Sequence, residues 1–400
     1  MTAAEKERIE RQGWNAAAGI PAGQPLFVWH SGPPWNKRYR LAHQPNGACV
    51  FLNEKGLCRI HAQFGEEAKP LACCIYPYAF HPTGRGTAVS LRFSCPSVIA
   101  NRGKPVREQA SDIRKLARAV VPKSVREIPP PKLSARSAVD WNGIRLFRQT
   151  LDSSLADESI PLVIRLRRIL TWLRLVDEAR LTGFSHEQLS EFLEIIVPTA
   201  DMVWPADSQD DSEGNPVQPL SAPARWMFRL LAGQYARKDT EASRPKGLAD
   251  RFRLLQAAIR ISRGKGTLPP LRDELAAVPF ERLEQPFGRP SIEMQEILTR
   301  YLRVKVQGMH FCGRGYYDVP LVEGFESLTL VYPVTFWLAR WYAASHDRDS
   351  LQTDDIAWAL ASVDHQHGYS PLFGSYNFRR RVRVLAARDE LGQLIHWYSR

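Results

Sequence analysis

The feature that most constrains this chain is a cluster of cysteines near its N-terminus. Five of its six cysteines stand at C-x8-C-x14-C-C-x20-C spacing, and they are Cys49, Cys58, Cys73, Cys74 and Cys95. The same segment is rich in glycine and proline and shows little clean periodicity of apolar residues. Such a region lacks the large apolar core that would hold it together, and a bound metal is the usual intracellular substitute. The segment therefore predicts a metal- or cluster-bearing module.

Thiolate sulfurs bind zinc tetrahedrally and also hold iron–sulfur clusters, and both centres need three or four sulfurs from separate parts of the chain. Four can come from Cys49, Cys58, Cys95 and one of the adjacent pair Cys73 and Cys74. Because the side chains of neighbouring cysteines diverge, the other member of the pair is spare or serves a polynuclear cluster. His61 is a further candidate ligand. The spacing contains no C-x2-C knuckle, so buried, unligated thiols remain the alternative interpretation.

The rest of the chain predicts a mainly α-helical protein with a small, irregular α+β cysteine-rich module at its N-terminus. We expect this module over residues 1–105, a connecting region with a helix and a Pro-rich stretch over 106–137, and a helical domain over 138–400. The chain has 400 residues and 44% hydrophobic content, which is enough for a substantial core. The string IPPPKLSARS in the connecting region is the best candidate for a linker.

Capping signals and apolar residues at helical spacing place the individual helices. Thr2 with Glu5, and Ser185 with Gln188, have the spacing of capping boxes. Helices are expected over 2–12, 159–180, from 185 onward, and over 224–237, 248–263, 291–306, 325–346, 353–363 and 376–388. Pro333 is expected to kink or split the helix over 325–346.

Less regular structure is expected between these helices. Residues 49–52 are a candidate strand, 53–56 a turn, and 57–61 a second strand or a turn into a short helix. Residues 201–223 are acidic and rich in turn formers, which predicts a surface loop. The G-x-G strings at Gly84 and Gly264 lack the third glycine of a dinucleotide fingerprint, so we interpret both as ordinary turns.

Charge and hydropathy bear on partners and location. The net charge of +12 favours acidic partners, while the sequence contains no nucleic-acid-binding motif, so a nucleic acid is not the expected partner. The basic run Arg379–Arg383 is interpreted as a solvated helix face. No secretory signal is visible, and the longest apolar run, over 328–339, is too short to cross a bilayer. We therefore expect a cytoplasmic protein with reduced thiols and no transmembrane segment.

Four short strings in the cysteine segment carry a resemblance to a known family. They are C-x-F-L, L-C-x-I-H, K-P-x-x-C-x-x-Y-P and S-C-P. Together they resemble the bacterial cysteine-cluster family called YkgJ or CxxCxxCC proteins, described as zinc- or iron-chelating, which includes the flagellin lysine N-methylase (FliB) branch. The matching residues are Cys49, Phe51, Leu52, Cys58, His61, Lys69, Pro70, Cys73 or Cys74, Pro77, Cys95 and Pro96. Two later strings, ILTRYL at Ile297 and VDHQH at Val363, are more loosely similar to the N-Y-L and E-H-N stretches of the methylase-like branch.

One departure from the family pattern concerns the start of the chain. The family opens with a C-x2-C-x2-C-C quartet just before a segment that resembles TAAEKERIERQGW of this chain, and here the sequence begins at Met1. Half of the family's thiols are therefore missing. This predicts one of three things: the start codon is assigned too far downstream, the remaining cysteines of a variant form one reduced site, or those cysteines bind nothing.

The resemblance implies a zinc or iron–sulfur centre and the activity of a protein-lysine N-methyltransferase that uses S-adenosylmethionine, with flagellin as a candidate substrate. Methyl transfer needs a bound donor and in-line geometry, but the sequence shows no Rossmann-type donor site. Catalytic residues therefore stay unknown, and whether the chain is an enzyme stays open. The alternative is a non-enzymatic module in which zinc staples the cysteine region and the basic helical domain binds an acidic macromolecular partner.

Three further groups of residues have plainer interpretations. The string at Asp364, DHQH, ends a predicted helix, where capping or surface duty is favoured over ligand or acid–base work. Phe336, Trp337, Trp341 and Tyr342 are expected in the core. Cys312 is expected to be a partly buried free thiol.

Overall fold

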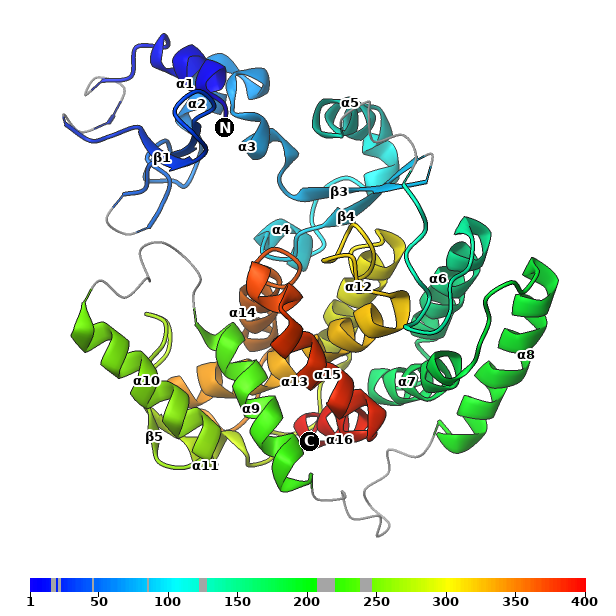
Figure 1. Ribbon diagram of the computed structural model, residues 1–400. Coiled ribbons are helices and arrows are strands. Elements are labelled where there is room, and N and C mark those ends of the chain that lie inside the picture. The colour runs from blue at the N-terminus through cyan, green and yellow to red at the C-terminus, as the bar shows by residue number, and fades with distance from the viewer. Residues whose placement is uncertain are drawn as a thin grey trace. The chain divides into compact units, whose positions relative to one another are not determined.

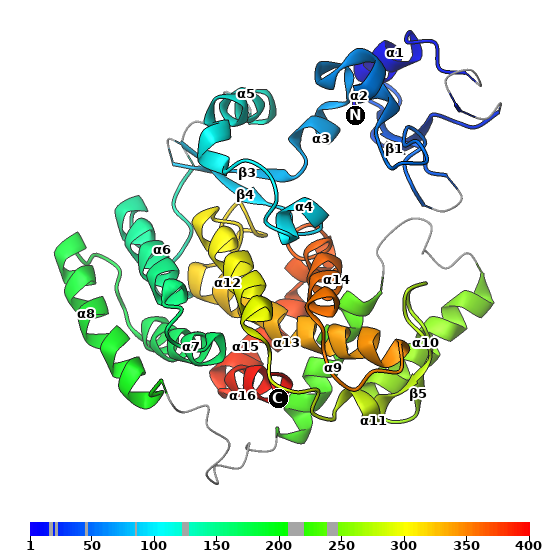
Figure 2. The same ribbon diagram turned by 180° about the vertical axis from the view of Figure 1, so that it is seen from behind.

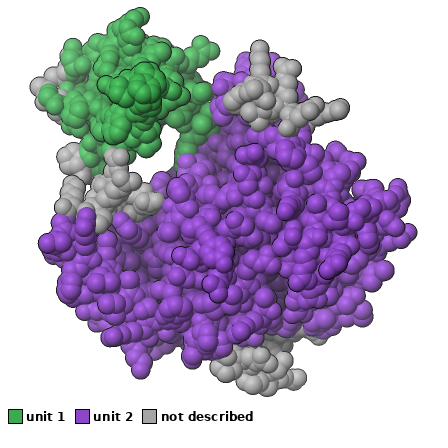
Figure 3. Space-filling model, viewed as in Figure 1, with its two compact units in different colours: residues 1–76 green, residues 77–400 purple. Residues whose placement is uncertain are grey.

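The structure is a computed structural model that describes residues 1–15, 19–20, 23–44, 47–84, 86–121, 128–206, 220–237 and 247–400. Within these ranges the chain is mainly helical, with small two-stranded antiparallel sheets, which confirms the expected fold class (Figure 1). It divides into two compact units, Met1–Tyr76 and Pro77–Arg400, coloured separately in Figure 3. The sequence places the end of the cysteine-rich module near residue 105, whereas the segment after Tyr76 packs with the second unit.

The first unit is small and held by few apolar side chains. Its elements are α1 (Ala3–Glu10), β1 (Phe27–Ser31), β2 (Arg38–Leu41), α2 (Arg59–Phe64), a 3-10 turn (Glu66–Ala68) and α3 (Leu71–Ile75). The capping box of Thr2 and Glu5 is confirmed, and a Glu5 carboxylate oxygen also accepts from the Leu71 amide at 2.8 Å, which joins α1 to α3. The buried core consists of Ile9, Ile20, Ala42, Val50, Phe51 and Ile60.

The expected strand over 49–52 is wrong. Cys49 and Leu52 each make only an isolated bridge, to His43 and Cys58. The turn after them is confirmed: the side chain of Asn53 accepts from the amides of Lys55 and Leu57, and this closes the loop ahead of α2. Local side-chain hydrogen bonding therefore replaces a strand ladder here.

The second unit begins with the hairpin of β3 (Tyr78–Thr83) and β4 (Gly86–Leu91), and the rest of it is mostly helical. Its helices are α4 (Pro96–Ile99), α5 (Ala110–Val120), α6 (Trp141–Ala156), α7 (Leu162–Glu178), α8 (His186–Val203), α9 (Ala222–Ala236), α10 (Leu248–Arg263), α11 (Phe280–Leu283), α12 (Ile292–Gln307), α13 (Leu321–Ser345), α14 (Thr353–Asp364), α15 (Tyr376–Ala387) and α16 (Glu390–Tyr398). It also contains the short pair β5 (Thr267–Leu268) and β6 (Val278–Pro279), and 3-10 turns over Val106–Gln109 and Pro371–Gly374. The sequence interpretation missed α6 and α16.

Helix α13 forms the centre of the second unit. It is surrounded by α7, α9, α12, α14, α15 and α16 in Figure 1 and in the reverse view of Figure 2. A helix that is apolar on every side belongs in a core, and nearly all of its residues are buried, including the predicted core residues Phe336, Trp337 and Trp341. Pro333 was expected to kink or split the helix, and because the helix continues through it, the split does not occur. Packing on all sides outweighs the one hydrogen bond that proline removes.

Several other expectations need adjustment. Of the predicted linker, residues 122–127 lie outside the described residues, and the remainder is packed: the amides of Leu321 and Val322 donate to the carbonyls of Lys132 and Leu133. Most of the predicted acidic loop, residues 207–219, also lies outside them. The strings at Gly84 and Gly264 lie in a hairpin turn and at a helix C-cap, as expected for turns, although Arg85 is not described.

The basic run on α15 is not simply a solvated face. Arg379 pairs with Glu323 at 2.5 Å and Arg383 with Asp177 at 2.9 Å, and all four side chains are at least partly buried. Glu326 lies near these ions, and burial raises its pKa to about 8 against the lowering effect of Arg383, with smaller raising contributions from Asp177 and Glu323. The carboxyl group is therefore neutral at pH 7.

This protonation makes stability depend on pH with a defined sign. Unfolded Glu326 ionises near its ordinary pKa of 4.5, whereas the folded group keeps its proton up to about pH 8. Between these values the unfolded state binds fewer protons, so the free energy of unfolding falls as pH rises, by at most about 1.4 kcal/mol per pH unit from this group. We expect Glu326→Gln to flatten that decline in urea unfolding at pH 5 to 8. A variant with the same slope as the parent protein would contradict this.

Candidate functional site

Three cysteines of the first unit come from three separate segments. Cys49 follows the bridge to His43, Cys58 stands at the N-cap position of α2 without a side-chain capping bond, and Cys73 lies within α3. Pro70 starts α3, where its missing amide costs no helical hydrogen bond. We call Cys49, Cys58 and Cys73 the thiol cluster.

The pKa values of two thiols in this cluster are raised by burial and, to a smaller extent, by other thiols. Partial burial and the charges of Cys49, Cys58 and Cys74 raise the pKa of Cys73 to about 11, although the residue as a whole is exposed. Burial, with a smaller contribution from Cys58, also raises the pKa of Cys49. The thiols of Cys49 and Cys73 therefore hold their protons in the absence of a cation, and ionising both requires positive charge beside them.

The adjacent cysteine has different surroundings. The thiol of Cys74 donates to the carbonyl of Glu66 at 3.4 Å, and the charged groups that affect its pKa are Lys69, Glu66, Arg8 and Glu5 rather than Cys49 or Cys58. Its side chain thus diverges from that of Cys73. His61 is exposed on α2.

The remaining cysteines lie in the second unit. Cys95 is half-buried at the N-cap of α4, ahead of Pro96, so the structure assigns it to a different unit from the thiol cluster. Cys312 is fully buried and unpaired, more deeply than expected, and burial raises its pKa.

The thiol cluster matches a thiolate metal centre in donor chemistry, since it offers three sulfurs on separate segments of a unit with a small core. In the described part of the chain, however, no group of three or more His, Cys, Asp or Glu side chains already has the arrangement of a metal site. Of the five cysteines predicted as ligands, Cys49, Cys58 and Cys73 form the thiol cluster, Cys74 acts on the pKa of Cys73 but donates its thiol to the Glu66 carbonyl, and Cys95 lies in the other unit.

The second unit contains charged and polar side chains that the sequence interpretation did not anticipate. Lys305, on α12, and Asp364, at the end of α14, pair at 2.6 Å with both side chains fully buried. The ammonium of Lys305 also donates to the Leu91 carbonyl at 3.1 Å and lies 3.2 Å from Nδ1 of His310. A second oxygen of Asp364 accepts from the Ser94 amide at 3.0 Å. The pair thereby joins α12, α14 and the β3–β4 hairpin.

Three histidines complete this group: His310 and His367 are buried, and His81 is partly buried. The ring of His81 lies 4.4 Å from that of His310, and Nδ1 of His367 lies 2.8 Å from the Tyr235 hydroxyl. Burial and the charge of Lys305 lower the pKa of His81 to about 4 and that of His367 to about 3, and they also lower the pKa of His310. We call Lys305, Asp364, His81, His310 and His367 the buried polar cluster.

Counting protons defines the chemistry of this cluster. The ammonium of Lys305 is surrounded by Asp364, the Leu91 carbonyl and Nδ1 of His310, and burial lowers its pKa against the opposing effect of Asp364. His310 accepts at Nδ1 and is neutral, which puts its proton on Nε2. In the described residues, Nε2 of each of the three histidines is buried without a hydrogen-bond partner. The cluster is thus a fixed ion pair beside neutral imidazoles.

The buried polar cluster corrects the interpretation of the DHQH string. Asp364, Gln366 and His367 are buried rather than at the surface. The cluster also brings together the two loosely matched strings, because the Tyr301 ring lies 5.3 Å from the ammonium of Lys305. The sequence contained a signal for this burial. Lys305 continues the apolar helical stripe of Met294, Leu298 and Tyr301. In the same way, Asp364 and His367 continue the stripe of Ile356 and Leu360.

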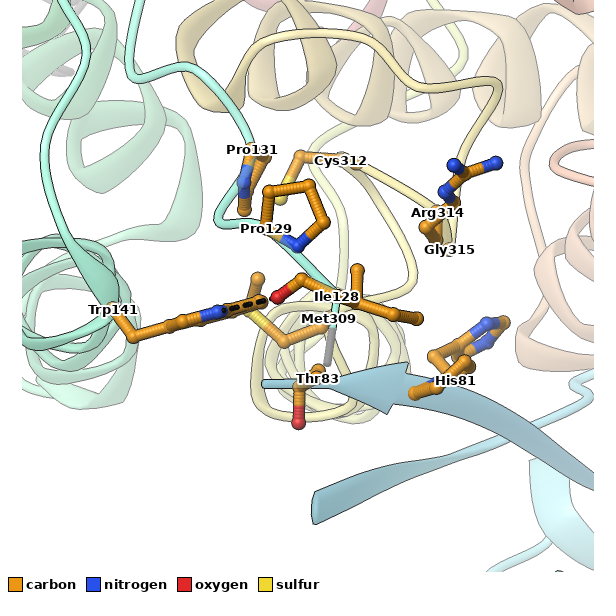
Figure 4. A pocket seen from close by; sticks show the side chains of 12 residues that line it. His81, Thr83, Ile128, Pro129, Pro131, Trp141, Met309, Cys312, Arg314 and Gly315 are labelled. Atoms are coloured by element: carbon orange, nitrogen blue, oxygen red, sulfur yellow. Dashed lines mark hydrogen bonds between the residues drawn. The ribbon is translucent and has the colours of Figure 1, made fainter. Parts of the chain in front are cut away.

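Two of the cavities in this unit are formed by described residues alone. The first, of about 10 Å³, has room for one water molecule and is lined by residues that include His81, Thr83, Met309 and Cys312 (Figure 4). The second is an open pocket of about 340 Å³ along α12, lined by Glu158, Glu296, Thr299, Arg300, Arg303, Val304 and Gln307. Its arginines are already engaged, Arg303 with Asp152 and Arg300 with the Ile99 carbonyl.

No helix in the described ranges is long and apolar enough to cross a membrane. Comparison with family models, with curated proteins and with solved structures found no match for this chain.

Proposed function

We propose that the first unit binds a metal ion or an iron–sulfur cluster through the thiolates of Cys49, Cys58 and Cys73. The observation that carries this proposal is that Cys49 and Cys58, from two other segments, both act on the pKa of Cys73. Burial is the main cause of the raised pKa of Cys49 and of Cys73, and a bound cation would favour their thiolate forms.

A centre at this place also answers a structural need. Among its described residues, the first unit has six buried apolar residues in its core, too few to hold a chain of this length firmly. Coordination would tie the turn at Cys49, the start of α2 and α3 to one another. Zinc would act as such a staple, and an iron–sulfur cluster would add electron transfer.

For the whole chain, we propose a YkgJ-like protein, with protein-lysine N-methyl transfer from S-adenosylmethionine as the finer hypothesis. The finer hypothesis rests on the cysteine strings and on the proximity of Tyr301 to the Lys305–Asp364 pair in the buried polar cluster. The competing function is a zinc-stapled module whose basic helical part binds an acidic partner, and the net charge of +12 supports it.

Adjacent cysteines provide a matched test of the metal centre. We expect Cys73→Ser to lose most of the bound metal, because its sulfur belongs to the thiol cluster, and Cys74→Ser to retain it, because that thiol faces Glu66. Zinc, iron and acid-labile sulfide are measured on anaerobically purified protein, together with its visible absorbance. Equal metal content in both variants would refute the assignment.

The enzyme hypothesis has its own readout. Metal-replete protein is incubated with S-adenosylmethionine and either flagellin or lysine peptides, and methyl-lysine is measured by mass spectrometry. Protein that holds its metal but neither binds the donor nor transfers a methyl group favours the binding module. A colourless protein with one equivalent of zinc excludes the iron–sulfur version while leaving the thiolate centre intact.

A further inference from the structure

Helix α10 carries an exposed apolar stripe on its outer face. Leu248, Phe252, Leu255 and Ile259 are 83%, 60%, 56% and 40% exposed and follow one another at intervals of four, three and four residues. Figures 1 and 2 show α10 at the rim of the second unit, beside α9. Large apolar side chains exposed in a row on one helix are unusual for a surface that contacts only water.

The inner face of the same helix is already used. Ala257 and Ile261 are buried, and Ile261 lies against Gly233 of α9, where a methyl group would come within 3.3 Å of it. The stripe therefore does not hold α10 in place.

The charges around the stripe are mostly positive. Arg251, Arg253, Arg260 and Arg263 are exposed on α10, against a single carboxylate, Asp250. If the stripe is treated as the a/d seam of a coiled coil, Arg251 and Arg263 occupy the flanking positions, where charges select the partner helix. Asp250 is partly neutralised by Arg253, at 4.0 Å.

We propose that the outer face of α10 docks an amphipathic helix with acidic flanks from a partner protein. The 4-3-4 spacing makes a narrow seam of the kind that packs against one helix, whereas lying in a membrane surface needs a wider apolar face. A second copy of α10 would set arginine against arginine, so self-pairing is disfavoured. Glutamates beside the partner's seam would pair with Arg251 and Arg263.

This inference is independent of the metal centre, and it gives the acidic partner of the competing function a defined surface. The probe is a fluorescein-labelled peptide of about three heptads with leucine at the seam and glutamate at the flanks. Anisotropy titration of the full chain is expected to show saturable binding that weakens as salt rises. We expect Phe252→Glu to weaken binding by about tenfold or more, because it removes a seam residue.

The matched control is Ile195→Glu, which places the same charge at another exposed apolar residue, on α8, and should leave binding unchanged. Reversing both flanks with Arg251→Glu and Arg263→Glu should transfer preference to a peptide with lysine flanks. Three results would overturn the proposal: no saturable binding of the peptide, Phe252-dependent binding to phosphatidylserine vesicles instead of the peptide, or a Phe252-dependent dimer in sedimentation. Metal content of each variant is measured in parallel, so failure here is distinguishable from failure of the thiolate centre.

Discussion

Asp364→Asn is expected to lower the free energy of unfolding of the second unit by about 3–5 kcal/mol, the usual cost of removing one partner of a buried ion pair. Asp364 and Lys305 are both fully buried, so the ammonium left behind has no water to compensate it. The substitution also places an amide donor or a weakened acceptor opposite the Ser94 amide. Denaturant unfolding followed by near-ultraviolet circular dichroism measures the effect.

The partner substitution should cost a similar amount, for a related reason. Lys305→Met leaves Asp364 as a buried carboxylate and removes donors to the Leu91 carbonyl and to Nδ1 of His310. The double variant Lys305→Met, Asp364→Asn should be destabilised by less than the sum of the two single variants. We expect a coupling energy of about 2 kcal/mol or more, because the double variant leaves no unpaired buried charge behind.

An exposed ion pair provides the control. Lys115 and Asp112 of α5 lie 3.5 Å apart with side chains 75% and 78% exposed, so Lys115→Met should change stability by less than about 1 kcal/mol. If Asp364→Asn were as mild as Lys115→Met, the account of the buried polar cluster would be wrong.

The second large effect concerns close packing at the start of α13. A methyl group added to Gly324 would overlap the carbonyl oxygen of Phe311 and contact Cys312 at 3.2 Å. Alanine has the higher helix propensity, by about 1 kcal/mol, but the overlap involves backbone that cannot move aside. We therefore expect Gly324→Ala to destabilise the protein by about 3 kcal/mol.

Gly233→Ala in α9 is the matched control for this prediction. It also lies within a helix, but its added methyl group would meet only the side chain of Ile261, at 3.3 Å. The gain in helix propensity and the tight contact should roughly cancel, leaving a change within about 1 kcal/mol. Thermal unfolding of both variants separates backbone overlap from the general effect of replacing glycine; equal melting temperatures would contradict the packing argument.

Local features were predictable because they act within one turn of chain. The capping boxes of Thr2 and Ser185 depend on partners three residues away, and both form as expected. Helix α10 has the expected bounds. The strand expected over 49–52 failed because two residues that bridge do not make a ladder without neighbours to continue it.

The candidate site was predictable only in part. Cysteine spacing identifies the segment that carries the thiol cluster, but it cannot tell which of Cys73 and Cys74 joins Cys49 and Cys58. The direction of each side chain on α3 decides that. Burial of the DHQH string also depends on Lys305, which is distant in the sequence. Because lysine is charged, its residue type alone predicts a surface position.

By itself, the sequence determined most of the long helices and the small cysteine-rich unit at the N-terminus, because each follows from residues close together in the chain. Only the tertiary structure decided which thiols are coupled and that Lys305 meets Asp364. Contacts between distant residues depend on the packing of whole helices, which no short pattern encodes. Burial then changes their chemistry, since loss of water raises the pKa of Cys73 and keeps the histidines of the buried polar cluster neutral.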